Sequence, residues 1–312
     1  MAFTTEQKKI IDEIKKLKKA KNAIVLVHNY QRPEIYEVAD FIGDSLKLCV
    51  EARNTNADII VFCGVSFMAE SAYILNPGKK VIIPFYDAGC AMADMLKPSD
   101  LIELKKKHPK AKVVTYINSS AEIKALSDAV CTSSSAVDVV KGLEGSEIIF
   151  VPDKNLTDYV AKQVSEKKII AFDGYCPIHD FLTRESLYEA KKEYGNAKII
   201  AHPESKDEIL ECADYISSTS EMINLAKKDP AKDFLVLTEC GMVERLKKEV
   251  PDKNFHGVCN FCFDMKKNTI ESVLKCLKEE KFVITVPKNV TEKALKAFNK
   301  MFELTKNGQK ND

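Results

Sequence analysis

Tryptophan is absent from this sequence of 312 residues, and only 5 histidines are present. Glycine and proline are also few, at 11 each, and no Gly/Ser-rich or Pro-rich linker divides the chain. Neither sign of charge is in excess, because the chain has 47 Lys and Arg residues and 46 Asp and Glu residues, which gives a formal net charge of +1. We therefore expect closely packed domains, and no broad binding to nucleic acid or to a membrane surface.

Long apolar runs are lacking too, since none approaches the ~18 residues that a membrane helix needs. At the N-terminus, Thr4 and Gln7 form the pattern of a capping box that opens an amphipathic helix. Asp12 and Glu13 interrupt any apolar core of a targeting segment. We therefore expect a cytoplasmic protein, in which the ten cysteines stay reduced and a disulfide framework does not form.

Short apolar runs alternate with amphipathic helical patterns along the chain. The helical patterns include 46–54, 136–143 and 221–228. The predicted strands are 23–27, 58–61, 81–83, 113–114, 148–151, 169–172, 199–201 and 234–237. This alternation predicts an α/β fold with parallel sheets that helices cover on both faces. No GxGxxG or GxxxxGK motif follows a strand, which excludes the usual dinucleotide and P-loop sites.

Three segments resemble one another, and they begin at Ala23, Ala111 and Ala197. Each is a short strand that ends in two polar side chains two residues apart, which strand periodicity places on one face. The pairs are His28 and Tyr30, Tyr116 and Asn118, and His202 and Glu204. Further along each segment an aspartate (Asp40, Asp128, Asp214) stands five residues before a hydroxyl residue (Ser45, Ser133, Thr219).

Cys90, Cys176 and Cys262 are spaced by 86 residues each. The chain is therefore predicted to contain three homologous α/β/α three-layer domains in a pseudo-threefold arrangement, so that corresponding strand ends converge on a central active site. The predicted divisions are an N-terminal helix at 1–21, repeats at 22–108, 109–194 and 195–282, and a strand/helix tail at 283–312.

Cysteines at equivalent positions suit an iron–sulfur cluster. Three thiolates bind three irons of a cubane, and the fourth iron is left open for substrate. Cys259 precedes Cys262 in a CxxC pattern, but the repeat register favours Cys262, with Cys259 inert or joined to it in a reversible disulfide. The remaining cysteines lack the repeat pattern, and we predict that they are core residues: Cys49, Cys63, Cys131, Cys212, Cys240 and Cys276.

The hydroxyl residues Ser45, Ser133 and Thr219 stand at or just before predicted helices, so they suit either capping or an anion bound at helix N-termini. Glu204 is the only carboxylate among the strand-end pairs, and it is our first choice for a general base, with Tyr30 or Tyr116 as phenolic partner. His108 and His256 lie outside the strand-end pattern, and we predict that they are surface residues. His179, three residues after Cys176, is expected to act only indirectly.

At these residues the chain resembles quinolinate synthase, the iron–sulfur enzyme family of de novo NAD biosynthesis. The resemblance runs nearly end to end. It rests on the motifs at 28–30, 67–70, 88–90, 116–118, 174–176, 202–204 and 262–269. Two residues depart from the family pattern: Phe263 follows Cys262 where we expect proline, and Ser66 replaces a histidine.

The resemblance implies three homologous α/β/α domains around a [4Fe–4S] cluster with three cysteine ligands, Cys90, Cys176 and Cys262. The reaction it implies joins iminosuccinate (iminoaspartate) to dihydroxyacetone phosphate, giving quinolinate, phosphate and water, with the open iron as Lewis acid. It also implies a functional link to L-aspartate oxidase or aspartate dehydrogenase. Tyr30 matches a catalytic tyrosine, and the residues that match the family's substrate site are His28, Ser45, Tyr116, Asn118, Ser133, His202, Glu204 and Thr219.

Two alternatives compete with this interpretation. A radical iron–sulfur transferase of the diphthamide-biosynthesis type also places one cysteine in each of three domains, but the strand-end motifs favour the synthase. An iron–sulfur or zinc sensor would need a partner surface or a DNA-binding segment, and the sequence shows neither.

Overall fold

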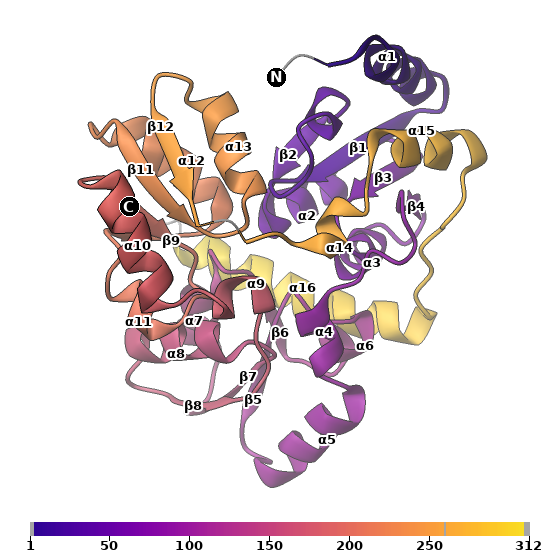
Figure 1. Cartoon of the computed structure of the whole chain (residues 1–312). Coiled ribbons are helices and arrows are strands. Elements are labelled where there is room, and N and C mark those ends of the chain that lie inside the picture. The colour runs from indigo at the N-terminus through magenta and orange to yellow at the C-terminus, as the bar shows by residue number, and fades with distance from the viewer. Residues whose placement is uncertain (1–2, 259, 309–312) are drawn as a thin grey trace. The chain divides into compact units, whose positions relative to one another are not determined.

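The computed structural model describes residues 3–258 and 260–308. Figure 1 shows the course of the whole chain, coloured from the N-terminus to the C-terminus. Contacts divide the chain into two compact units. Unit 1 comprises Met1–Cys90 and Cys262–Pro287, and unit 2 comprises Ala91–Phe261 and Lys288–Asp312. None of the helices in the described part of the chain combines the length and the apolar composition of a membrane span.

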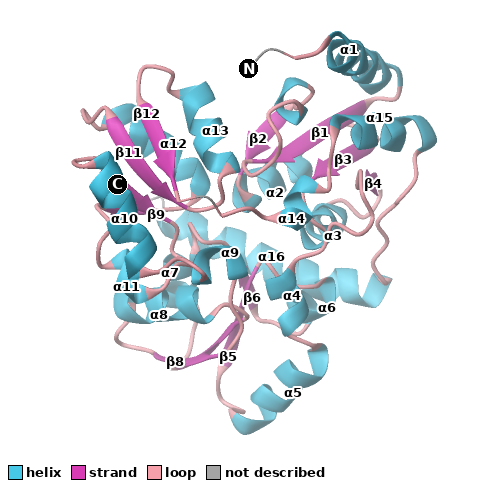
Figure 2. Cartoon of the chain, in the orientation of Figure 1, coloured by secondary structure: helices cyan, strands magenta, loops and turns pink. Residues whose placement is uncertain are grey.

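The described residues form three four-stranded parallel sheets, with helices around the strands (Figure 2). The first sheet contains β1 (Ala23–His28), β2 (Phe41–Gly43), β3 (Ile59–Cys63) and β4 (Lys80–Ile82). The second contains β5 (Lys112–Tyr116), β6 (Ala129–Cys131), β7 (Glu147–Val151) and β8 (Lys168–Ala171). The third contains β9 (Lys198–Ala201), β10 (Tyr215–Ile216), β11 (Asp233–Leu237) and β12 (Asn254–Gly257). The predicted α/β class with parallel sheets is confirmed.

The three sheets share one strand order and one register. Their orders are β2-β1-β3-β4, β6-β5-β7-β8 and β10-β9-β11-β12. On the two central strands, partners are 36 residues apart in every sheet: Ala23 with Ile59, Lys112 with Ile148, and Lys198 with Phe234. The repeat is therefore present in the backbone pairing. The strands of each sheet fall inside the predicted ranges 22–108, 109–194 and 195–282, whose boundaries stay a prediction.

The repeated aspartates fasten the second strand of each sheet to the first. In repeat 2, the carboxylate of Asp128 accepts a hydrogen bond from the backbone N–H of Val113 (2.8 Å), and the Asp128 N–H donates to the Val113 carbonyl (2.9 Å). Asp40 and Asp214 make the same two bonds, to Val25 and Ile199. These residues are therefore structural clamps.

Unit 1 has three layers around the first sheet. Its helices are α1 (Thr5–Ala20), η1 (Ile35–Glu37), α2 (Ser45–Asn54), α3 (Ser66–Leu75), α14 (Phe263–Lys266) and α15 (Ile270–Glu279). The helices α1 and α15 cover the face that carries Val25, Val27 and Val61, and α2 and α3 pack on the sheet as well. The capping box of Thr4 and Gln7 at the start of α1 is confirmed.

Unit 2 contains the second and third sheets. Its helices are α4 (Ala91–Met95), α5 (Pro98–Lys107), α6 (Ala121–Ala125), α7 (Ala136–Gly142), α8 (Lys154–Gln163), α9 (Pro177–Asp180), α10 (Arg184–Tyr194), α11 (Asp207–Leu210), α12 (Thr219–Lys228), α13 (Gly241–Glu249) and α16 (Lys288–Gly308). The C-terminal helix α16 packs against α6, α7 and β6, with Ala297 and Phe298 buried.

Candidate functional site

Cys90, Cys176 and Cys262 occupy the same local position in the three repeats. Each directly precedes a short helix, α4, α9 or α14. The carbonyl two residues before each cysteine accepts a hydrogen bond from a backbone N–H just after the third strand of its sheet. These bonds run from Ser66 to Ala88 (2.7 Å), from Lys154 to Gly174 (2.7 Å) and from Cys240 to Asn260 (2.9 Å).

The loop that carries the first cysteine is longer than the other two. Cys90 stands 50 residues after its clamp Asp40, whereas Cys176 and Cys262 stand 48 residues after Asp128 and Asp214. The clamp aspartates are not equally spaced, because Asp40 and Asp128 are 88 residues apart and Asp128 and Asp214 are 86 residues apart. The equal spacing of the cysteines therefore conceals a difference of two residues between repeat 1 and the other two repeats. Hydrogen bonding, rather than spacing, establishes the equivalence.

The Phe263 departure leaves the loop of the third cysteine unchanged. Cys176 before Pro177 has φ −81° and ψ 114°, and Cys262 before Phe263 has φ −81° and ψ 100°. Both residues stand at the N-cap position of a short helix, where proline is well accommodated as the next residue. Phenylalanine therefore adopts the same turn without the constraint of the proline ring.

Exposure distinguishes the candidate cysteines from most of the others. Cys90, Cys176 and Cys262 are partly exposed, whereas Cys49, Cys63, Cys131 and Cys276 are buried, as predicted for core residues. The core prediction is wrong for Cys240, which is partly exposed and directly precedes α13. Cys212 follows α11 by two residues and is partly exposed, but it packs against the hydrophobic core of the third sheet. Cys259 lies outside the described residues.

A buried polar cluster in unit 2 surrounds Glu204. The Glu204 Oε2 atom lies 3.1 Å from His179 Nδ1 and 3.0 Å from His202 Nδ1, and the two imidazole rings stack with centroids 4.6 Å apart. All three side chains are at least 95% buried. Burial alone would raise the pKa of Glu204, but the charges of His179 and His202 beside it outweigh this effect and lower the pKa. Glu204 is therefore held as a carboxylate.

Glu204 also retains an unused acceptor. Its Oε1 atom is buried and has no hydrogen-bond partner among the described residues. Leaving such an oxygen unpaired is unfavourable, so buried polar atoms without partners commonly mark a place for a ligand or water. Cys176 Sγ belongs to the same cluster, because this sulfur and one atom each of His179 and Glu204 lie within 4.8 Å of one another.

Asp153 and Asn155 hold this cluster in place from the start of α8. The Asp153 carboxylate accepts hydrogen bonds from the backbone N–H groups of Leu156 (2.7 Å) and Cys176 (3.0 Å). Burial, reinforced by the charge of Glu204, raises the pKa of Asp153. Asn155 Nδ2 donates to the Glu204 carbonyl (3.1 Å). Sequence reasoning missed both residues, and the place of Asp153 two residues after a predicted strand was the available signal.

In repeats 1 and 3, a local turn rather than a shared strand face joins the two members of the strand-end pair. The first strand of each sheet ends at His28, Tyr116 or Ala201. The Tyr30 N–H then donates to His28 Nδ1 (3.2 Å), and the Glu204 N–H lies 3.4 Å from His202 Nδ1 in the same way. His28, Tyr30, Tyr116 and His202 are buried, and the Oδ1 atom of the partly exposed Asn118 is buried without a hydrogen-bond partner in the described chain.

The hydroxyl residues are not the caps of their helices. The N-cap residues of α2, α7 and α12 are Asp44, Ser135 and Ser218. Ser45 and Thr219 are the first helical residues, and Ser133 stands two residues before its cap. The capping alternative is therefore wrong for all three, and their repetition needs another explanation.

In unit 1, Lys266 joins the segment after Cys262 to the strand-end pair of repeat 1. Its buried ammonium group donates to the Tyr30 carbonyl, and Arg32 Nε donates to the Lys266 carbonyl (3.0 Å). Asn268 Nδ2 donates to the Gly64 carbonyl (2.8 Å). The α14 segment and the end of β1 therefore form one bonded group, which sequence reasoning did not predict.

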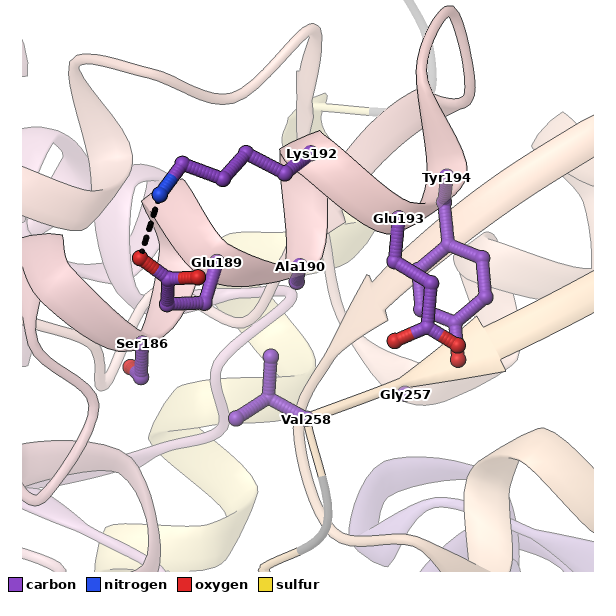
Figure 3. A pocket seen from close by; sticks show the side chains of 8 residues that line it. All are labelled: Ser186, Glu189, Ala190, Lys192, Glu193, Tyr194, Gly257 and Val258. Carbon is purple, nitrogen blue, oxygen red and sulfur yellow. Dashed lines mark hydrogen bonds and ion pairs between the residues drawn. The ribbon is translucent and has the colours of Figure 1, made fainter.

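A cavity of about 480 Å³ lies elsewhere in unit 2, between α10 and the end of β12 (Figure 3). Lys192 and Glu189 form an ion pair at its rim (2.8 Å), and Tyr194 stacks on His256 (4.0 Å between centroids). It shares no lining residue with the Glu204 cluster, and its charged side chains are exposed. We assign it no part in the chemistry.

Three α/β repeats, each with a cysteine at the same loop position, together with a buried carboxylate that contacts two stacked histidines, define an α/β enzyme with a metal cofactor. The family model described as "Quinolinate synthetase A protein" matches residues 12–303. The chain is 48% identical to quinolinate synthase of Thermodesulfovibrio yellowstonii over 94% of this chain and 98% of the relative. It is 49% identical to the enzyme of Methanosarcina barkeri, over 95% and 98%. The chain belongs to the quinolinate synthase family.

Family membership decides between the alternatives considered from the sequence. It supports an enzyme that acts on small molecules and carries a metal cofactor. Nothing in the comparisons favours the radical transferase of the diphthamide type. The prediction of a cytoplasmic location stays a prediction.

Proposed function

We propose that this chain condenses iminosuccinate with dihydroxyacetone phosphate to give quinolinate, inorganic phosphate and water. The observation that carries the proposal is the family match over residues 12–303, combined with a cysteine at one equivalent position in each repeat. L-Aspartate oxidase or aspartate dehydrogenase would supply the unstable imine.

The cofactor in this proposal is a [4Fe–4S] cluster held by Cys90, Cys176 and Cys262. The donor set fits, because three partly exposed thiols stand at equivalent loop positions and a thiolate is the ligand that iron–sulfur clusters use. When bound, such a cluster supplies an iron with an open position that acts as a Lewis acid. Asp153 supports the second ligand by fixing the Cys176 backbone.

Glu204 is the proposed general base. Its carboxylate is buried and contacts two stacked histidines through Oε2, while Oε1 remains available to a substrate proton. Tyr30 and Tyr116 are the proposed phenolic partners, and both are buried at the ends of their strands. Burial in this cluster removes competing water from Glu204.

The remaining residues of the proposed substrate site would bind the carboxylates and the phosphate. Ser45 and Thr219 are the first residues of helices of ten residues each, where N–H groups and the helix dipole favour an anion. Because capping does not explain the hydroxyl set, a ligand does so best. The full set in this role is His28, Ser45, Tyr116, Asn118, Ser133, His202, Glu204 and Thr219.

Anaerobic purification, iron and sulfide quantitation and an absorption spectrum, followed by a quinolinate assay, test the proposal. We expect about four irons per chain, from the composition of the cubane, and quinolinate from the two substrates. Cys90→Ala, Cys176→Ala and Cys262→Ala should each lose the cluster, whereas Cys259→Ala and the control Cys212→Ala should keep it. S-adenosylmethionine cleavage without quinolinate would overturn the assignment.

A further inference from the structure

Cys176, His179 and Glu204 present three different donor atoms in one place. The Cys176 sulfur, one ring nitrogen of His179 and one carboxylate oxygen of Glu204 lie within 4.8 Å of one another, and all belong to unit 2. Sulfur, imidazole nitrogen and carboxylate oxygen are the ligands that proteins use for zinc. Three protein ligands leave a fourth position for water.

Two atoms of this cluster are buried and have no partner with hydrogen-bond geometry among the described residues. His179 is 1% exposed and Glu204 is 3% exposed. His179 Nδ1 and Glu204 Oε1 have no hydrogen-bond partner among the residues that the structure describes, although Nδ1 lies 3.1 Å from Oε2. A bound cation would satisfy both atoms.

The surroundings already orient the three residues as a metal site requires. The other ring nitrogen of His179, Nε2, lies 2.8 Å from Thr238 Oγ1, which fixes the ring. Histidine ligands of metals usually have such a partner on the outer nitrogen. Asp153 holds the Cys176 backbone (3.0 Å), and Asn155 holds the Glu204 carbonyl (3.1 Å).

We propose that Cys176, His179 and Glu204 bind a single divalent cation of the zinc class when the chain carries no iron–sulfur cluster. On binding, the Cys176 thiol and a protonated His179 ring each release a proton to solvent, and the sulfur and the freed ring nitrogen coordinate the cation. Zinc exceeds iron(II) in affinity for such donors, so it competes for the empty chain. Cys176 is common to both sites, so zinc and the cluster exclude one another; this exclusion rests on the proposed cluster.

The first experiment measures metal binding to the full chain stripped of metal under anaerobic, reducing conditions. Zinc is titrated against a chromophoric chelator, and cobalt(II) is added separately as a spectroscopic probe. We expect one equivalent of either metal, with a sulfur-to-cobalt charge-transfer band that shows a thiolate ligand. If the charge-transfer band is absent, or if the unaltered chain binds no metal at equimolar concentration, the proposal is overturned, and no variant is needed to show it.

Variants separate this site from the cluster cysteines. His179→Gln and Glu204→Gln should weaken zinc binding about tenfold or more, and Thr238→Val should weaken it by less, because it only orients His179. Cys90→Ala should bind zinc as the unaltered chain does, although it cannot hold the cluster. Circular dichroism checks that each variant is folded. Dependence on Cys90 but not on His179 would place the metal at the cluster cysteines and refute the site.

A reconstitution experiment tests the exclusion. The stripped chain is given one equivalent of zinc, and iron and sulfide are then added. We expect the cluster to form more slowly than without zinc, and we expect a zinc chelator to restore the original rate. His179→Gln should lose this sensitivity to zinc. A chain that makes no quinolinate would contradict the proposed function but not the zinc site. A chain that binds no zinc would contradict the zinc site but not the proposed function. The two proposals can therefore be refuted separately.

Discussion

The Asp153 carboxylate accepts a hydrogen bond from the backbone N–H of Cys176, with 3.0 Å between the two atoms. The same carboxylate accepts from the Leu156 N–H at the start of α8 (2.7 Å) and is completely buried. One side chain thus caps a helix and fixes the loop of a proposed cluster ligand. The stability of unit 2 and the position of Cys176 therefore depend on the same carboxylate.

Asp153→Ala should destabilise the protein by about 1–3 kcal/mol, because it leaves two backbone N–H groups without an acceptor. The measurement is the denaturation midpoint of the chain without its cofactor. Asp173→Ala is the matched control, since the Asp173 side chain is 90% exposed and its ion pair among the described residues is with Lys154 at the surface. The control should change stability by no more than about 0.5 kcal/mol. Equal losses in the two variants would contradict the role of Asp153.

Glu204→Gln should reduce the rate of quinolinate formation by about 10²- to 10⁴-fold, because glutamine keeps the shape of the side chain but accepts no proton at neutral pH. The iron content should stay that of the unaltered protein, since Glu204 is not a proposed cluster ligand. Glu208→Gln is the control, a surface carboxylate near Arg184 in the same segment. A Glu204→Gln variant with the unaltered rate would remove Glu204 as the base.

The sequence predicted the repeats because three copies of a pattern reinforce one another. All eight expected strands are present, whereas β2, β6, β10 and β12 were not predicted. The first three of these are only two or three residues long, and they depend on the clamp aspartates and on pairing with a neighbouring strand. Such short edge strands carry too few residues for an alternating pattern, so tertiary contacts decide them.

Some residues of the candidate site could likewise be predicted from the sequence, and others could not. Comparing repeats finds what they share, and so it found the cysteines, the strand-end pairs and the hydroxyl residues. His179 escapes this comparison because the residues three places after Cys90 and Cys262 are Ala93 and Met265. Its contacts with Glu204 and Thr238 are made between segments distant in the sequence, and only the folded chain shows them.

Glu280→Gln should alter the pH dependence of stability. Hydrogen bonds from Lys21 and Lys80, together with their charges, lower the pKa of Glu280 from 4.5 to about 2. A depressed carboxyl pKa stabilises the fold above the unfolded value of 4.5, and this contribution is lost as the pH falls toward 2. The variant should therefore be less stable by at most about 1 kcal/mol near pH 7, and equal to the unaltered protein near pH 2.

Urea midpoints measured between pH 2 and pH 7 test this expectation, with Glu13→Gln as the control. In the part of the chain that the structure describes, Glu13 pairs with Lys278 on the surface, and this pair also joins α1 to α15. Its removal should shift the midpoint little at any pH, because exposed ion pairs contribute little. A Glu280→Gln deficit that stays constant down to pH 2 would exclude the ion pairs as its cause.

Phe263→Pro should be tolerated and should raise stability by about 0.4–1 kcal/mol. The preceding residue, Cys262, has nearly the backbone angles of Cys176 before Pro177, so proline enters the turn without a change of conformation. The gain comes from the unfolded chain, which loses conformational freedom. Pro177→Ala is the reciprocal variant and should lose a similar amount. If Phe263→Pro instead lowers the denaturation midpoint, the exposed Phe263 ring makes contacts that outweigh the entropy, and the two cysteine loops are equivalent in backbone only.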